Sequence, residues 1–191
     1  MDTRNKYFGY LFFKLLKIGL FCKKAKKDML KIVNTNQHEK LYKLMEFFDK
    51  LCLKFNIKYF INGGTLLGAV RHGHIIPWDD DIDISMFEED IQKLQSTEVS
   101  TYITKHNYKL LNGWVLKFVE VGDEAKNNGL NAWIDIFKMR INGDKVEYFE
   151  SNHLKRWPTE WFYENEIKPY KRYKFGNLEV FGPNKNNPFT R

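Results

Sequence analysis

Apolar residues recur every three or four positions over residues 37–55, and this spacing predicts a long helix that buries one face. Just before it, Asn36 is followed three residues later by Glu39, a pairing that resembles a capping box and places the helix start. The apolar face consists of Leu41, Leu44, Met45, Phe48, Leu51, Cys52 and Phe55. Cys52 is therefore interpreted as a core residue.

The pattern changes after this helix to a short β-prone run over residues 57–61. Asn62, Gly63 and Gly64 interrupt the run, and residues 65–71 are again helical in character. The two glycines are therefore expected at a strand-to-helix turn, where backbone amides can approach a ligand closely.

Strict alternation of polar and apolar residues predicts a strand over residues 81–86, with Asp81 and Asp83 on its polar face. A helix is expected over residues 88–95. Further strands are predicted at 108–111, 114–121 and 133–139, and a hairpin at 171–181 turns at Gly176-Asn177. Because helices and strands are mixed, the predicted fold class is α/β or α+β with one central sheet.

Four aspartates fall within residues 79–83, and structure alone explains them poorly, because like charges repel and strands are depleted of aspartate. Asp81 and Asp83 leave the same face of the strand, so their carboxylates need a counter-charge. An all-oxygen ligand set favours Mg²⁺, Mn²⁺ or Ca²⁺ over zinc. An EF-hand loop does not fit, since Ile84 stands where it requires glycine and Asp90 where it requires glutamate.

A third carboxylate, Asp135, stands in the middle of the apolar run 133–137, where burial is unfavourable unless the group is paired or binds a metal. If this strand neighbours the first, Asp135 joins Asp81 and Asp83 on one ion. With the glycine turn, such a group can neutralise phosphate charge and position an attacking hydroxyl. The alternative is a solvated acidic turn with one satisfied core aspartate.

Composition and charge narrow the function further. The 191-residue chain suits one domain with a short appendage, its 43% of apolar residues support a core, and two cysteines are too few for a disulfide scaffold. Nine of the 31 Lys and Arg but only two of the 24 Asp and Glu lie in residues 1–31, so that segment accounts for the whole net charge of +7. A basic groove across the domain is thereby excluded, and no nucleic-acid partner is expected.

Residues 7–22 are apolar at helical spacing, contain two lysines, and precede a lysine cluster at 23–27. This run is short for a bilayer span and lacks a signal-peptide cleavage pattern. We expect residues 7–31 to bind an anionic membrane surface, which makes the protein cytoplasmic and peripherally membrane-associated. A helix packed on the domain and a true membrane anchor are the alternatives.

Two consecutive motifs resemble the signature of the LicD family. The first is NGGTLLGAVRH over residues 62–72, and the second is IPWDDDIDI over residues 76–84. Residues 133–137 are similar to a later Asp-Ile-Phe strand of the family, and residues 169–181 to its C-terminal segment. The resemblance covers roughly residues 38–191, and the family includes bacterial phosphocholine transferases and, more distantly, fukutin.

This resemblance implies a nucleotidyltransferase-like fold over residues 36–191, a mixed central sheet flanked by helices. Residues 1–35, which the resemblance leaves out, are expected from their own pattern to form a basic amphipathic N-terminal helix. Because relatives usually continue beyond the position of Arg191, the domain is expected to be shortened at its C-terminus. The implied reaction moves a substituted phosphate from a CDP-activated alcohol, such as CDP-choline or CDP-ribitol, to a sugar hydroxyl of a glycan, and CMP leaves.

By the same resemblance, the three aspartates would hold Mg²⁺ or Mn²⁺, with Asp135 as the third ligand or as the base on the acceptor hydroxyl. Gly63, Gly64 and Thr65 would meet the phosphates, and Arg71 would offset developing phosphate charge. A surface salt bridge is the alternative role for Arg71.

The sequence does not choose between choline and ribitol. A quaternary ammonium needs an aromatic surface, for which Trp78, Trp114 and Trp133 are candidates, although such residues more often lie in a core. Two rival functions also stay open. One is a nucleotidyltransferase that releases pyrophosphate, and the other is a catalytically inactive binding module.

Overall fold

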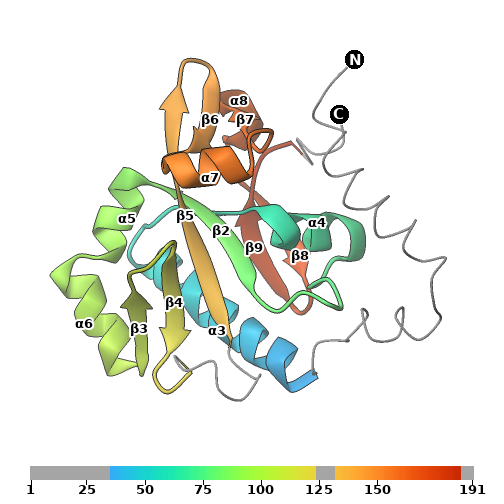
Figure 1. The fold of residues 1–191 in the computed structure, drawn as a ribbon. Coiled ribbons are helices and arrows are strands. Elements are labelled where there is room, and N and C mark those ends of the chain that lie inside the picture. Colours follow the sequence, from blue (N-terminus) through green and yellow to red (C-terminus); the bar gives the residue numbers. More distant parts are fainter. Residues whose placement is uncertain (1–34, 124–131, 186–191) are drawn as a thin grey trace.

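Helix α3 (Thr35–Lys54) packs the apolar stripe found in the sequence against a central sheet (Figure 1). This computed structural model describes residues 35–123 and 132–185. Leu41, Met45, Phe48 and Cys52 of the helix are fully buried, as the helical spacing predicts. The helix begins one residue before Asn36, so the predicted capping box does not mark its start.

The strands of the sheet are β1 (Phe60–Ile61), β2 (Ile82–Phe87), β3 (Tyr108–Leu111), β4 (Leu116–Glu120), β5 (Trp133–Asn142), β6 (Lys145–Tyr148) and β7 (Phe162–Tyr163). Their order is β1-β2-β5-β4-β3, and β6 pairs with the far half of β5 and with β7. Strands β2 and β5 run parallel, and the other described pairs of this sheet are antiparallel. Such a parallel pair needs a long crossover, which the chain between β2 and β5 supplies.

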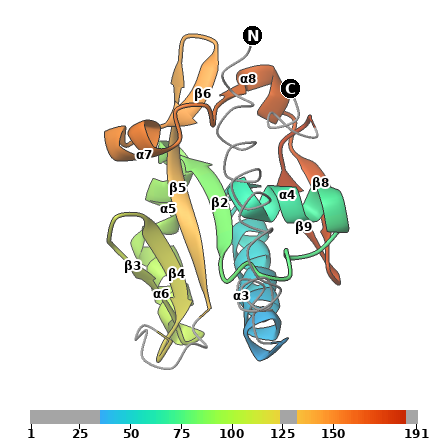
Figure 2. The same ribbon diagram turned by 45° about the vertical axis from the view of Figure 1, so that its right-hand side comes forward.

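Within residues 35–123 and 132–185, five shorter helices complete the fold: α4 (Gly63–His72), α5 (Glu88–Leu94), α6 (Thr97–Lys105), α7 (Ser151–Arg156) and α8 (Glu164–Ile167). Helix α4 and the hairpin of β8 (Lys171–Phe175) and β9 (Leu178–Gly182) lie on the β1 side of the sheet, opposite β3 and β4 (Figures 1 and 2). The predicted fold class, a mixed central sheet flanked by helices, is confirmed.

Two strands are shorter than the sequence predicts. Of residues 57–61, Phe60 and Ile61 alone form β1, because the backbone N–H of Lys58 donates to Asp90 Oδ1 (3.0 Å) at the start of α5. Strand β4 begins at Leu116, two residues later than predicted. The predicted strand at 108–111 and the hairpin around Gly176 are confirmed.

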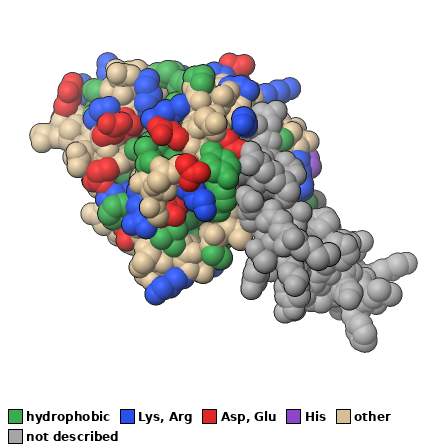
Figure 3. All heavy atoms as spheres, turned by 90° about the horizontal axis from the view of Figure 1, so that it is seen from above, with side chains coloured by type: hydrophobic (Ala, Val, Ile, Leu, Met, Phe, Trp, Pro, Cys, Tyr) green, Lys and Arg blue, Asp and Glu red, His purple; other side chains and the backbone are tan. Residues whose placement is uncertain are grey.

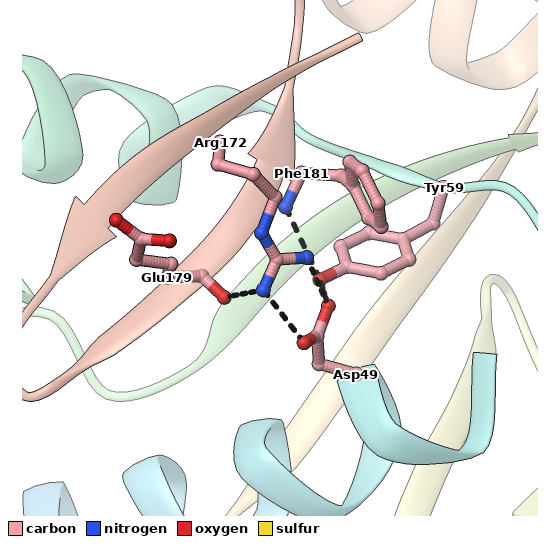
Figure 4. A network of polar contacts seen from close by, with 5 residues as sticks. All are labelled: Asp49, Tyr59, Arg172, Glu179 and Phe181. Atoms are coloured by element: carbon pink, nitrogen blue, oxygen red, sulfur yellow. Dashed lines mark hydrogen bonds and ion pairs between the residues drawn. The ribbon is translucent and has the colours of Figure 1, made fainter. Parts of the chain in front are cut away.

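A partly buried ionic network ties the C-terminal hairpin to α3 (Figure 4). The Arg172 guanidinium on β8 donates to both carboxylate oxygens of Asp49 on α3, at 2.8 Å each. Tyr59 donates its hydroxyl proton to the same carboxylate and accepts the backbone N–H of Phe181 at 3.3 Å. Arg172 also contacts the carbonyl of Glu179, so one guanidinium joins helix and hairpin.

Basic and acidic side chains are interspersed over the face drawn in Figure 3, in keeping with their near-equal numbers outside residues 1–31. The predicted membrane-binding segment 7–31 lies outside the described residues, so that prediction and the peripheral membrane location stay predictions. In the part of the chain that the structure describes, no helix is both long and apolar enough to span a bilayer.

Replacing Arg172 by methionine should destabilise the fold. The Asp49 side chain, 11% exposed, would lose its counter-charge, and breaking a buried pair costs about 3–5 kcal/mol. The Arg172 side chain is 31% exposed, so water screens this pair in part. We therefore expect the free energy of unfolding, measured with urea, to fall by less than for a fully buried pair, by about 2–3 kcal/mol.

The matched control is Lys50→Met on α3, the helix that carries Asp49. Lys50 pairs with Glu46 at the surface, where its side chain is 70% exposed, so the change should cost at most about 0.5 kcal/mol. Equal losses for the two variants would contradict the anchoring role of Arg172.

Candidate active site

The site begins at the turn between β1 and α4. Asn62 extends the β1 backbone by donating its N–H to the carbonyl of Asp83 on β2 (3.1 Å), and its own carbonyl accepts from Leu66 in the first turn of α4 (3.0 Å). Gly63 has a φ of +51°, in the left-handed region that favours glycine. The glycines therefore lie at a strand-to-helix turn as predicted, although the helix begins at Gly63, two residues early.

Two aspartates approach this turn so closely that side chains larger than hydrogen would clash. A Cβ atom on Gly63 would lie 2.7 Å from Asp83 Oδ2. A Cβ atom on Gly64 would lie 2.6 Å from Asp79 Oδ2. Glycine is therefore required here by the carboxylates as well as by the backbone.

The parallel register of β2 and β5 places Asp83 directly opposite Asp135. Asp81 immediately precedes β2, and its carboxylate reaches the same place. Each of the three carboxylates offers one oxygen, and these atoms lie within 4.8 Å of one another. The structure thus brings together Asp81, Asp83 and Asp135, on which the sequence analysis depended.

Burial and mutual repulsion hold these carboxylates toward their neutral forms. Burial first, and then the neighbouring Asp79, raise the pKa of Asp81 to about 7. Burial and the charge of Asp81 raise the pKa of Asp83 well above its usual range. Burial also raises the pKa of Asp79 to about 6. Burial raises the pKa of Asp135 as well, while the nearby Lys117 acts to lower it. A group of this kind gains most from a bound cation.

Among the described residues, Lys117 places a positive charge beside the cluster. It lies on β4 directly opposite Asp135, forms an ion pair with it, and holds its ammonium 4.6 Å from the centre of the Trp133 ring. The sequence analysis missed this residue, since only the pairing of β4 with β5 brings it to the site.

The three carboxylates fit a hard divalent cation. The donor set is all oxygen, and the atoms are close enough to share an ion. Burial and the neighbouring carboxylates raise the pKa values of Asp81 and Asp83, so a cation would stabilise their charged forms. Asp79 and Asp80 form a second acidic group with Asp81. Carboxylate ligands suit Mg²⁺, Mn²⁺ and Ca²⁺.

The first turn of helix α3 contacts the backbone of the acidic loop, residues 79–81. Gln37 Nε2 donates to the carbonyl of Asp80 (3.1 Å), and His38 Nε2 lies 2.9 Å from the carbonyl of Asp79. These contacts fix the backbone that carries Asp79–Asp81, so the first turn of α3 positions the cluster without joining it.

The N-terminus of α4 suits a phosphate group. The first N–H groups of a helix have no acceptor within the helix, and the helix dipole favours an anion there. The Asn62 side chain does not cap this helix, because its amide donates to Ser85 Oγ (3.0 Å) and Tyr148 Oη (3.2 Å). Thr65 is 2% exposed, and its hydroxyl oxygen accepts the backbone N–H of Asp83 (2.8 Å), so it also positions the carboxylate.

Arg71 lies in the last turn of α4, at the end opposite the glycines. Eight residues of helix separate it from Gly63, which is about 12 Å along the axis. Its side chain is exposed, and no hydrogen bond or ion pair between described residues joins it to the carboxylates. Its predicted contact with phosphate stays a prediction.

The sequence of this chain matches a known protein family. A sequence model described as LicD/FKTN/FKRP, nucleotidyltransferase domain, matches residues 56–185, more than half of the chain. Among solved structures, that of ANT(2″)-Ia in complex with adenylyl-2″-tobramycin is similar with a TM-score of 0.47 at 12% identity, over 74% of this chain and 69% of that chain.

Three relatives illustrate the range of the sequence similarity. An uncharacterized protein of Rickettsia typhi is 38% identical over 143 residues, which are 75% of this chain and 41% of that protein. The lipopolysaccharide cholinephosphotransferase LicD of Haemophilus influenzae is 40% identical over 65 residues, 34% of this chain and 24% of the relative. The ribitol 5-phosphate transferase FKRP of Homo sapiens is 32% identical over 106 residues, 53% and 17% respectively. The chain spans less than half the length of each of these three proteins.

Substituting Gly63 by alanine should displace Asp83 and abolish cation binding. The left-handed backbone costs an alanine about 1–2 kcal/mol, and the new Cβ would also meet the carboxylate at 2.7 Å. Gly143→Ala is the matched control, because Gly143 has a φ of +64° and nothing within 4 Å of its Cβ position. Gly63→Ala should lose at least as much stability in urea as Gly143→Ala, and it alone should lose Mg²⁺ binding in calorimetry; retained binding would contradict this site.

The stability of the cation-free protein should fall as pH rises. An unfolded aspartate has a pKa of about 3.9, so raised values for Asp79 and Asp81 mean that the unfolded chain releases these protons first. Without a divalent cation, the free energy of unfolding therefore decreases between about pH 4 and about pH 7. Mg²⁺ binds the ionised carboxylates, so its stabilising effect should grow over the same window.

Thermal unfolding with EDTA and with MgCl₂, at about pH 5 and about pH 8, measures this effect. At 100 times its Kd, Mg²⁺ should add about 2.7 kcal/mol at the higher pH and much less at the lower. The Asp81→Asn variant should be at least as stable as wild type in EDTA at the higher pH and should respond little to Mg²⁺. A magnesium effect equal at both pH values would count against the cluster as its binding site.

Proposed function

The chain belongs to the LicD family, and on this premise we propose that it is an enzyme that transfers a substituted phosphate from a CDP-activated alcohol to a sugar hydroxyl of a glycoconjugate. The observation that carries this proposal is the meeting of three carboxylates from β2, β5 and the preceding loop at the glycine turn that opens α4. The names of two relatives, a cholinephosphotransferase and a ribitol 5-phosphate transferase, describe this type of transfer.

Asp81, Asp83 and Asp135 would hold Mg²⁺ or Mn²⁺ in this proposal. The bound ion would neutralise phosphate charge and lower the pKa of an attacking hydroxyl. The free N–H groups at the start of α4, at Gly63, Gly64 and Thr65, would bind the oxygens of the donor phosphates. These residues orient the donor so that its reacting phosphorus lies beside the carboxylates.

The reaction would proceed by attack of the acceptor oxygen on the phosphorus that carries the alcohol. A new bond forms between the sugar oxygen and this phosphorus, and the bond to the bridging oxygen breaks. That oxygen leaves with CMP, and the proton of the sugar hydroxyl passes to a carboxylate, for which Asp135 is the candidate base.

Lys117 would serve as the fixed positive charge of the site, since its ion pair with Asp135 places it there. It orients that carboxylate and offsets part of the negative charge when no substrate is bound. Arg71 would offset phosphate charge only where the donor extends to the last turn of α4.

Incubation of the purified chain with MgCl₂, a CDP-alcohol and an acceptor glycan tests the proposal by the release of CMP. Release of pyrophosphate from a nucleoside triphosphate would instead identify a nucleotidyltransferase. The matching family model is described as a nucleotidyltransferase domain, so this is the second candidate function. Release of neither product would leave the chain a binding module.

The Asp83→Asn variant should lower the rate of CMP release by at least about 100-fold, the scale of removing one strong electrostatic contribution to catalysis. Its cation-free fold should persist, because a neutral side chain suits this buried position better than an ionised one. Asp144→Asn, at an exposed position in the turn between β5 and β6, is the matched control and should keep wild-type activity. Unchanged turnover in Asp83→Asn would place the chemistry elsewhere.

A further inference from the structure

A cavity of about 130 Å³ adjoins the carboxylate cluster and shares Asp83 with it. It lies next to the glycine turn of α4, and its volume is below the about 300–1,000 Å³ of pockets that enclose a whole drug-sized ligand. The cavity therefore suits a small group attached to the reacting phosphate. Its remaining walls come from Asn62, Leu67, Phe137, Tyr148, Trp157 and Glu160.

Three aromatic rings meet in these walls at differing angles. The ring of Phe137 lies 5.4 Å from that of Tyr148 and 5.7 Å from that of Trp157, and the last two are 5.6 Å apart. They come from β5, from β6 and from the residue after α7, so the tertiary fold creates this group. Aromatic faces attract cations through their quadrupole, and the attraction strengthens where water is excluded.

The cavity also carries negative charge that no basic side chain of its lining balances. Glu160 Oε2 accepts the Tyr148 hydroxyl proton (2.8 Å), and no lysine or arginine forms an ion pair with Glu160 within residues 35–123 and 132–185. Burial raises the pKa of Glu160, and its charge adds to the rise in the pKa of Asp83. A positively charged ligand would stabilise both carboxylates.

The side-chain protons of Asn62 and Tyr148 beside the cavity are already engaged in hydrogen bonds. Asn62 gives its amide protons to Ser85 and Tyr148, and Tyr148 gives its proton to Glu160. The Asn62 side-chain oxygen is buried and has no partner among the described residues. A polyol requires both donors and acceptors, whereas an ammonium group requires only negative charge, acceptors and aromatic faces.

We propose that this cavity binds the ammonium headgroup of the transferred alcohol, so that the enzyme selects a donor with a cationic alcohol over one with a neutral polyol. This inference rests on the proposed function. In it, Glu160 and the rings of Phe137, Tyr148 and Trp157 hold the headgroup, while the neighbouring cluster holds the phosphate to which the headgroup is attached.

Binding of the free headgroup phosphates measures this selectivity without turnover. Titration calorimetry of the full chain with MgCl₂ should show phosphocholine or phosphoethanolamine binding at least about 10-fold more tightly than ribitol 5-phosphate, the effect expected of one desolvated cation–aromatic contact. Phosphocholine and phosphoethanolamine distinguish a quaternary from a primary ammonium. Ribitol 5-phosphate binding as tightly as both amines would overturn the inference.

The Glu160→Gln variant removes the charge, keeps the shape and can still accept from Tyr148, so it should abolish the preference for the cationic ligand. Glu164→Gln on α8 is the matched control, because Glu164 is half-exposed and does not line the cavity. Trp157→Leu keeps apolar volume but removes the ring, and it should lower the preference for the cationic ligand about 10-fold. This second variant tests the inference independently if Glu160→Gln does not fold. A preference unchanged in Trp157→Leu, or in folded Glu160→Gln, would refute this assignment.

Turnover with CDP-choline, CDP-ethanolamine and CDP-ribitol separates this inference from the function on which it rests. CMP released preferentially from CDP-ribitol would keep the proposed function and refute the ammonium site. Preferential binding of a cationic headgroup with no CMP from any donor would keep the site and refute the transferase.

Discussion

The fold is organised around the problem of holding several like charges in one small volume. Parallel pairing of β2 with β5 sets Asp83 opposite Asp135, and the chain just before β2 adds Asp81. Repulsion and burial make this arrangement unfavourable without positive charge, which is why the pKa values of these groups rise. The neighbouring structure, from the glycine turn to Lys117, accommodates these carboxylates or offsets their charge.

The supporting elements have separate tasks. Strand β5 carries the cluster on one half and pairs with β6 on the other, so one strand joins the carboxylates to the aromatic wall of the cavity. The side chains of Thr65 and Asn62 hold the start of α4 against β2 and β6 instead of capping the helix. The helix N-terminus thereby stays available for an anion, and Asn62 also lines the adjoining cavity.

The sequence is informative where the chemistry is local. The stripe of α3, the glycine turn and the alternation that carries Asp83 depend on spacing along the chain, and each appears where the pattern predicts it. Lys117 and Glu160 depend on partners far away in the sequence, and spacing does not encode strand register or loop position. The tryptophans show the same limit. Of the three that the sequence offered, Trp78 and Trp114 are half-exposed, and Trp133 lies under Lys117. The tryptophan that lines the cavity is Trp157, which comes from a segment without clear periodicity.

The bond between Arg172 and Asp49 has a consequence for how the protein is made. Synthesis from the N-terminus delivers α3 and Asp49 more than a hundred residues before Arg172 leaves the ribosome. Until then, packing α3 on the sheet buries the Asp49 carboxylate without the Arg172 guanidinium that pairs with it, which disfavours this packing. Because α3 also supports the acidic loop through Gln37 and His38, a nascent chain that ends before the hairpin lacks a firmly held carboxylate cluster. The charged site therefore gains its full support only when nearly all of the described fold has emerged.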